Sequence, residues 1–232
     1  MLQKKLIQNL NNTLFKKNYY FFFLTISSFF FTFYYGFIGI FPIDSFLIYD
    51  AGYKISNGYH PFKDYWSITG PLLDYIQFVF FKIFGINWFS YVLHAAILNF
   101  LVTLTFFYFF IKLKINPANS FLYSLSASIL AYPSVGTPFM DHHAVIFSII
   151  SGIFLFLAFL KDRPLYWFLV PIFLSASFLS KQIPSAYLFF LFTLFILLFW
   201  IFFSPKNYKF IIYLFIGSIL SIFIFFFIYF SK

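Results

Sequence analysis

Long apolar segments separated by short polar ones dominate the chain. Stretches without acidic or basic residues fill seven ranges: 19–43, 83–111, 115–140, 144–160, 164–180, 182–205 and 210–231. An apolar run of roughly 17–25 residues spans the hydrocarbon core of a bilayer as an α-helix. The pattern therefore predicts an all-α membrane protein with about seven transmembrane helices.

The composition agrees with this pattern and excludes a soluble protein. Hydrophobic residues make up 62% of the chain and charged residues 9%, against about 25% charged in a typical soluble domain. A globule of 232 residues cannot bury 45 Phe and 18 Tyr, so lipid must be the main solvent. The chain has no cysteine, which excludes disulfides, a thiolate nucleophile and Cys-ligated metals.

The apolar range 71–84 differs from the other seven. As a helix its 14 residues extend only about 21 Å, less than the roughly 30 Å hydrocarbon core. It also carries Asp74 and Gln77, which are three residues apart and share one helix face, together with Lys82. We expect an interfacial helix that lies along the membrane surface, with Gly70-Pro71 at its start.

The basic residues indicate which way the chain is inserted. If 71–84 does not cross, ten Lys and Arg residues lie on one side and five on the other, whereas a crossing gives seven and eight. Basic residues favour the cytoplasmic side, so the first topology is preferred. It predicts a cytoplasmic segment 1–18, a membrane domain 19–232 and an inside N-terminus in the cytoplasmic membrane. The net charge of +9 then reflects orientation, and no nucleic-acid partner is expected.

The same topology gathers most titratable side chains on the outer face. Five of the six acidic residues fall there, and Asp162 falls inside. The outer group consists of Asp44, Asp50, Asp64, Asp74 and Asp141, with His60, His142 and His143. His94 is expected near the outer interface as a hydrogen-bonded residue. This asymmetry predicts a functional site on the outer face.

The outer loop 44–70 is the one extended polar region between apolar runs. Its spacing predicts an amphipathic helix from Asp44 to Asn57, with Asp44 at the N-cap and Gly58 at the end. Asp50 and Lys54 form a favourable i,i+4 pair on the polar face. The apolar face contains Leu47, Ile48, Ala51 and Ile55.

A series of short motifs runs through the outer loop and the later helix ends. They are Asp44, Asn57-Gly58, His60-Pro61-Phe62-Lys63-Asp64-Tyr65-Trp66, Gly70-Pro71-Leu72, Asp141 and Ser180-Lys181-Gln182. In their order and spacing these motifs resemble the GT-C glycosyltransferases, which include protein mannosyltransferases and lipid A aminoarabinose transferases. The resemblance covers residues 19 to about 203. Members show an acidic pair after the first span, where this chain has Asp44-Ser45, and a Pro-Pro pair where it has Gly70-Pro71.

The resemblance implies transfer of a sugar from a polyprenyl-phosphate donor to a glycan, lipid or protein acceptor at the outer face. Asp44 is then the general base and Asp141 a second catalytic carboxylate, while Lys181 binds the lipid phosphate. Asp64, His142 and His143 are the further substrate-binding candidates. No cofactor is required, although a divalent metal stays an open alternative.

Each assignment has a structural alternative. Asp44 could be only a helix N-cap, Asp64 a loop-fixing residue that bonds backbone amides, and Lys181 a side chain that extends to the lipid headgroups. Adjacent residues on a helix do not share a face, which disfavours a metal held by Asp141, His142 and His143.

The class of protein also has alternatives. Members of the GT-C family are commonly longer, so the chain could be a short transferase, a half completed by a partner subunit, or a truncated product. A transporter or lipid flippase, and a non-catalytic subunit with the same scaffold, are the competing functions. A transporter would place ionisable residues deep within its spans, and the sequence has almost none there.

Overall fold

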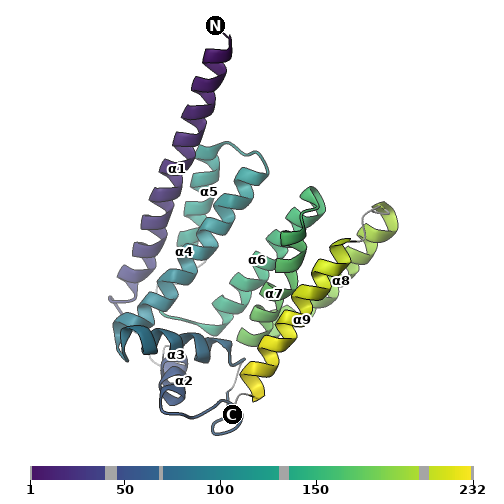
Figure 1. The fold of residues 1–232 in the computed structure, drawn as a ribbon. Coiled ribbons are helices and arrows are strands. Elements are labelled where there is room, and N and C mark those ends of the chain that lie inside the picture. Colours follow the sequence, from purple (N-terminus) through teal and green to yellow (C-terminus); the bar gives the residue numbers. More distant parts are fainter. Residues whose placement is uncertain (1, 40–45, 68–69, 131–135, 204–208, 231–232) are drawn as a thin grey trace. The chain divides into compact units, whose positions relative to one another are not determined.

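The computed structural model describes residues 2–39, 46–67, 70–130, 136–203 and 209–230, so Asp44 lies outside the described residues. The described part is all-helical and contains no strand (Figure 1). Its helices are α1 (Leu2–Tyr35), α2 (Leu47–Ser56), α3 (Leu72–Phe84), α4 (Trp88–Lys112), α5 (Pro117–Leu130), α6 (Met140–Lys161), α7 (Pro164–Ser180), α8 (Gln182–Phe203) and α9 (Lys209–Phe230).

Four of the described helices are long and apolar enough to cross a bilayer: α4, α6, α8 and α9. Helix α7 is apolar but shorter, with 17 residues. The chain is therefore a helical, multi-pass membrane protein, and the total of seven crossings stays a prediction. Helix α1 continues through residue 18 without a break, and α5 covers only part of the predicted segment 115–140.

The chain divides into two compact units. Unit 1 consists of Met1–Ile40 and Ala95–Gly136, and unit 2 consists of Phe41–His94 and Thr137–Lys232. Within unit 1, the buried amide of Asn99 donates hydrogen bonds to Ser28 O, Thr32 Oγ1 and Ser128 O. One side chain thus joins α1, α4 and α5. The predicted site residues that the structure describes all belong to unit 2.

Helix α7 packs against α6, α8 and α9 within unit 2. Small polar side chains join α6 to α7: the Ser148 and Ser177 hydroxyls lie 2.7 Å apart, and Ser151 donates to Val170 O at 2.8 Å. Inside a bilayer, apolar side chains contact lipid as favourably as they contact another helix, so the hydrophobic effect does not drive helices together. Close packing and interhelical hydrogen bonds stabilise their association.

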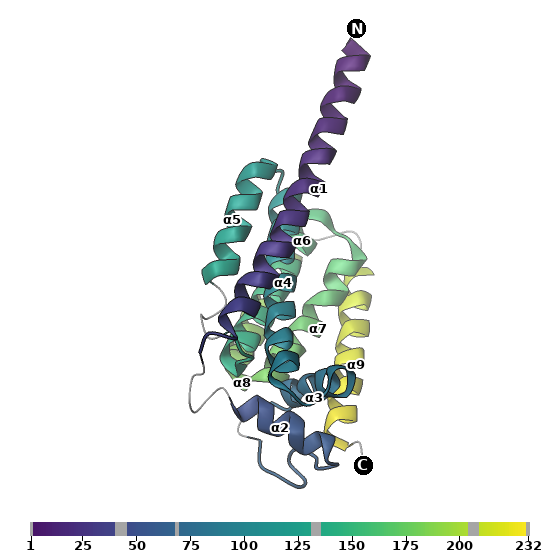
Figure 2. The same ribbon diagram turned by 90° about the vertical axis from the view of Figure 1, so that its left-hand side faces the viewer.

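Helices α2 and α3 cross at one end of unit 2 (Figures 1 and 2). The two helices pack so closely that a Cβ added at Gly52 would lie only 2.7 Å from Gln77 Cγ. Ile48, Ala51 and Ile55 are buried there, which confirms most of the predicted apolar face, although Leu47 is exposed.

Several local predictions for this region are confirmed. The Asp50–Lys54 ion pair forms at 2.7 Å, and α3 starts directly after Pro71. Helix α2 has Phe46 at its N-cap position, two residues after the predicted N-cap. Asp44, the predicted N-cap, lies outside the described residues.

Gly70 fixes the end of the outer loop onto α7. Its amide donates to Ser180 O at 3.2 Å, and a Cβ at this position would lie 1.8 Å from Leu179 O. Because the obstacle is backbone, no side-chain movement could relieve that clash. A residue without a side chain is therefore required where the loop reaches the end of α7.

Candidate functional site

The end of unit 2 that carries α2 and α3 also holds the first turn of α6 and the junction between α7 and α8 (Figures 1 and 2). We call this the loop end. Two arrangements of charged side chains lie there: an ion pair between Asp141 and Lys181, and a buried cluster around Asp74.

Asp141 and Lys181 were predicted as a catalytic carboxylate and a phosphate-binding lysine, and the structure brings them together. The Lys181 ammonium donates to Asp141 Oδ1, although the two residues are 40 positions apart. Asp141 stands in the first turn of α6, where the helix dipole favours a negative charge. Both side chains are partly exposed. Water screens such a pair and limits its contribution to stability, so it serves mainly to hold a carboxylate and an ammonium at one place.

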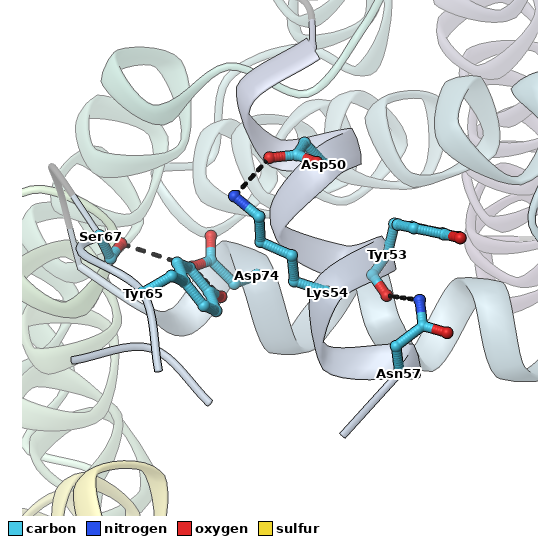
Figure 3. A network of polar contacts seen from close by, with 7 residues as sticks. All are labelled: Asp50, Tyr53, Lys54, Asn57, Tyr65, Ser67 and Asp74. Carbon is cyan, nitrogen blue, oxygen red and sulfur yellow. Dashed lines mark hydrogen bonds and ion pairs between the residues drawn. The ribbon is translucent and has the colours of Figure 1, made fainter. Parts of the chain in front are cut away.

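Asp74 is the most buried carboxylate among the described residues, with 4% of its surface exposed. It accepts hydrogen bonds from Tyr65 Oη at 3.1 Å and Ser67 Oγ at 3.4 Å (Figure 3). Two loop residues are thus tied to the face of α3. The sequence predicted only that Asp74 shares a helix face with Gln77. It did not predict the contacts with Tyr65 and Ser67, because contacts made by an irregular loop leave no periodic pattern in the sequence.

A cavity of about 90 Å³ lies over this cluster. Lys54 and Asp50 line it from α2, Trp66 and Tyr65 from the loop, and Asp74 from α3. The Lys54 ammonium pairs with Asp50 and also lies 5.1 Å from the centre of the Tyr65 ring, within the range of a cation–π contact. The cavity therefore combines a carboxylate, an ion pair, a phenol and an indole.

Burial sets the electrostatics of the cluster. It raises the pKa of Asp74 from 3.8 to about 7, against the opposing effects of the hydrogen bonds from Tyr65 and Ser67 and the charge of Lys54. Burial also raises the pKa of Tyr65, and the nearby Asp74 charge adds to that rise. Desolvation disfavours a charged carboxylate, so Asp74 exchanges its proton near neutral pH.

A second buried arrangement links α3, α4 and α6. His94 Nδ1 lies 2.9 Å from Gln77 Oε1, and His94 Nε2 lies 3.1 Å from His143 Nε2. His143 Nδ1 lies 2.8 Å from Phe139 O. Gln77, His94 and His143 are all buried, so this chain of hydrogen bonds joins three helices within unit 2.

The remaining predicted site residues take no part in the Asp141–Lys181 ion pair or in the hydrogen bonds to Asp74, or lie outside the described ranges. Asp64 is exposed and accepts a hydrogen bond from His60 N at 2.8 Å, which confirms that it fixes the loop. His143 is directed into the interior, whereas His142 is partly exposed and packs beside Phe139. The roles of Asp44, Asp64, His142 and His143 toward a substrate stay predictions.

No metal site forms within the described ranges. No three His, Asp or Glu side chains there gather closely enough to hold an ion. Both ring nitrogens of His143 already face hydrogen-bond partners, so it is not available as a ligand beside Asp141. The described residues thus offer no set of ligands for a divalent metal.

Comparisons with known proteins add no family assignment. No protein-family model, curated protein or solved structure matches the chain.

The raised pKa of Asp74 predicts a pH-dependent stability. The folded state binds a proton on Asp74 more tightly than the unfolded state does, so the contribution of this residue to the free energy of unfolding falls as pH rises from about 4 to about 7. Asp74→Asn removes this titration. We expect the melting temperature of the variant in detergent, relative to wild type, to rise across that window and then level off.

Tyr65→Phe provides a matched comparison. It removes a hydrogen bond that lowers the pKa of Asp74, so the upper end of the window should move to higher pH while the lower end, set by the unfolded state, stays near about 4. A difference between Asp74→Asn and wild type that stays constant from pH 4 to 8 would contradict the account.

Proposed function

We propose that the protein is a membrane glycosyltransferase that moves a sugar from a polyprenyl-phosphate donor to an acceptor hydroxyl. The observation that carries the proposal is the meeting of Asp141 and Lys181 at the loop end, close in the chain to an apolar groove. The proposed location is the outer face of the cytoplasmic membrane, with seven crossings and an inside N-terminus.

The groove suits a polyprenyl chain. It has a volume of about 480 Å³ and is lined by residues of α7, α8 and α9, among them Leu174, Phe178, Leu179, Ser185 and Phe189. Leu179 and Ser185 lie on either side of Lys181 in the chain. A long apolar chain in this groove would place its phosphate near an ammonium group, which binds phosphate as a point charge with three donors.

The reaction is a single displacement. The acceptor oxygen forms a bond to the anomeric carbon, and the bond from that carbon to the phosphate oxygen breaks. The polyprenyl phosphate leaves as an anion, and a carboxylate takes the proton of the acceptor hydroxyl. Asp44 is the proposed base. Asp141 pairs with Lys181 and helps to orient the substrates.

Lys181→Gln tests the binding of the donor. A charge-assisted hydrogen bond contributes about 1.5–3 kcal/mol, so we expect the affinity for a plain polyprenyl phosphate to fall about tenfold or more, measured with the full chain in lipid nanodiscs. Lys63→Gln, which removes an exposed loop lysine, is the matched control and should bind like wild type. Equal affinities for wild type and Lys181→Gln would reject the phosphate site.

Asp44→Asn tests the chemical step. Loss of a general base costs roughly 10²–10⁴-fold in rate, so sugar transfer from a panel of polyprenyl-phosphate sugars should fall by about that much. Binding of the polyprenyl phosphate should be retained. The control Asp162→Asn alters a carboxylate at the C-cap of α6, which has no proposed role in the site, and should keep most of its activity. Transfer by Asp44→Asn at the wild-type rate would show that another group is the base.

A further inference from the structure

Packing against the rest of the protein does not explain the position of the Trp66 side chain. It has 80% of its surface exposed, although its neighbours Tyr65 and Ser67 both bond the buried Asp74. The loop is therefore held in place on both sides of Trp66, although most of the indole itself is exposed. Phe62 stands edge-on beside it, with ring centres 6.1 Å apart. The result is a fixed aromatic surface at the rim of the Asp74 cavity.

The polar groups of the cavity suit hydroxyl groups. Asp50 and Asp74 can accept hydrogen bonds, Lys54 can donate them, and the Tyr65 hydroxyl can do both. All four line the cavity, and the Asp50–Lys54 pair and the hydrogen bonds from Tyr65 and Ser67 to Asp74 hold them in place (Figure 3). Because Lys54 is already paired with Asp50, the cavity offers no net positive charge to a phosphate.

The size of the cavity limits how much of a ligand it can hold. Its volume of about 90 Å³ is well below the roughly 300–1,000 Å³ of pockets that enclose a whole small ligand. That is room for the hydroxyl-bearing edge of a ring, while the rest of the ring stays outside. An aromatic surface beside a small polar pocket provides an apolar contact and a few orienting hydrogen bonds.

We propose that Trp66 and the cavity formed by Asp50, Lys54, Tyr65 and Asp74 bind a sugar ring. One face of the ring stacks its C–H groups on the indole, and two or three hydroxyls on one edge enter the cavity and replace water there. This inference rests on the proposed function in one respect only: the proposed function identifies the substrate of which the sugar is a part. The binding of a neutral saccharide is a separate property of the loop end.

The test uses the full chain in lipid nanodiscs with free glucose, mannose and galactose as probes. Saturation-transfer NMR measures binding, and we expect at least one of the three to bind in the millimolar range. Trp66→Ala should weaken that binding about tenfold or more without loss of folding, because the indole is exposed. Trp200→Ala, which removes an exposed indole from α8 outside the cavity, should bind like wild type.

Exchanging the probes between Lys181→Gln and Trp66→Ala separates this site from the phosphate site. Lys181→Gln should keep sugar binding, and Trp66→Ala should keep the binding of polyprenyl phosphate. If sugar binding survives while no donor is turned over, the sugar site stands and the transferase proposal fails.

Trp66 could instead anchor the loop in the headgroup region, as interfacial tryptophans do. Quenching by brominated acyl chains that falls markedly in Trp66→Ala would identify such an anchor and overturn the proposal. Failure of all three sugars to bind, or equal binding by wild type and Trp66→Ala, would also overturn it.

Discussion

A charge cannot be hydrated inside hydrocarbon, and this constraint determines where the chain places its ionisable groups. Asp141 stands in the first turn of α6 and Lys161 in its last, while Lys181 follows the end of α7. Helix α8 contains no Asp, Glu, Lys or Arg. Within the described residues of unit 2, the hydroxyls of Ser148 and Ser151 on α6 bond to groups of α7. The resulting concentration of charge at helix ends is what makes the loop end chemically distinct.

The loop end therefore needs interactions of its own that hold it in place. Helices α2 and α3 bury apolar faces against each other at Gly52, and Gly70 joins the loop to the end of α7. Asp74 completes the attachment by accepting hydrogen bonds from the loop at the cost of its own desolvation. One carboxylate thus has a structural role, while Asp141 and Lys181 stay partly exposed and free to exchange partners. This separation supports the proposed division between a sugar-binding cavity and a phosphate-binding lysine.

Some of the fold could be predicted from hydrophobicity alone. The predicted range 164–180 coincides with α7, because Asp162, Arg163 and Lys181 limit an uninterrupted apolar run on both sides. The start of α1 was harder to predict, because the polar residues in its first half are also helical. The predicted segment 115–140 is only partly helical in the described residues, because apolar composition does not show where a helix stops.

The site was less accessible to sequence reasoning. Asp141 and Lys181 were each assigned a role only through the resemblance of their motifs. Their contact was not predicted, because no spacing rule links residues 40 positions apart. The contact of Tyr65 and Ser67 with Asp74 depends on how an irregular loop folds over α3, and His94 meets His143 only when α4 and α6 pack. Such tertiary contacts leave no trace in hydrophobic periodicity.

The central claim is that α3 lies along the membrane and does not cross it, since a crossing would put the loop and Asp141 on opposite sides. The chain has no cysteine, so single cysteines can be introduced at Lys63 before α3, at the exposed Ile86 after it and at Arg163 as an inside reference. The account predicts that a membrane-impermeant maleimide applied to intact cells labels positions 63 and 86 but not 163. Labelling of position 63 without 86, or of 86 without 63, would contradict it.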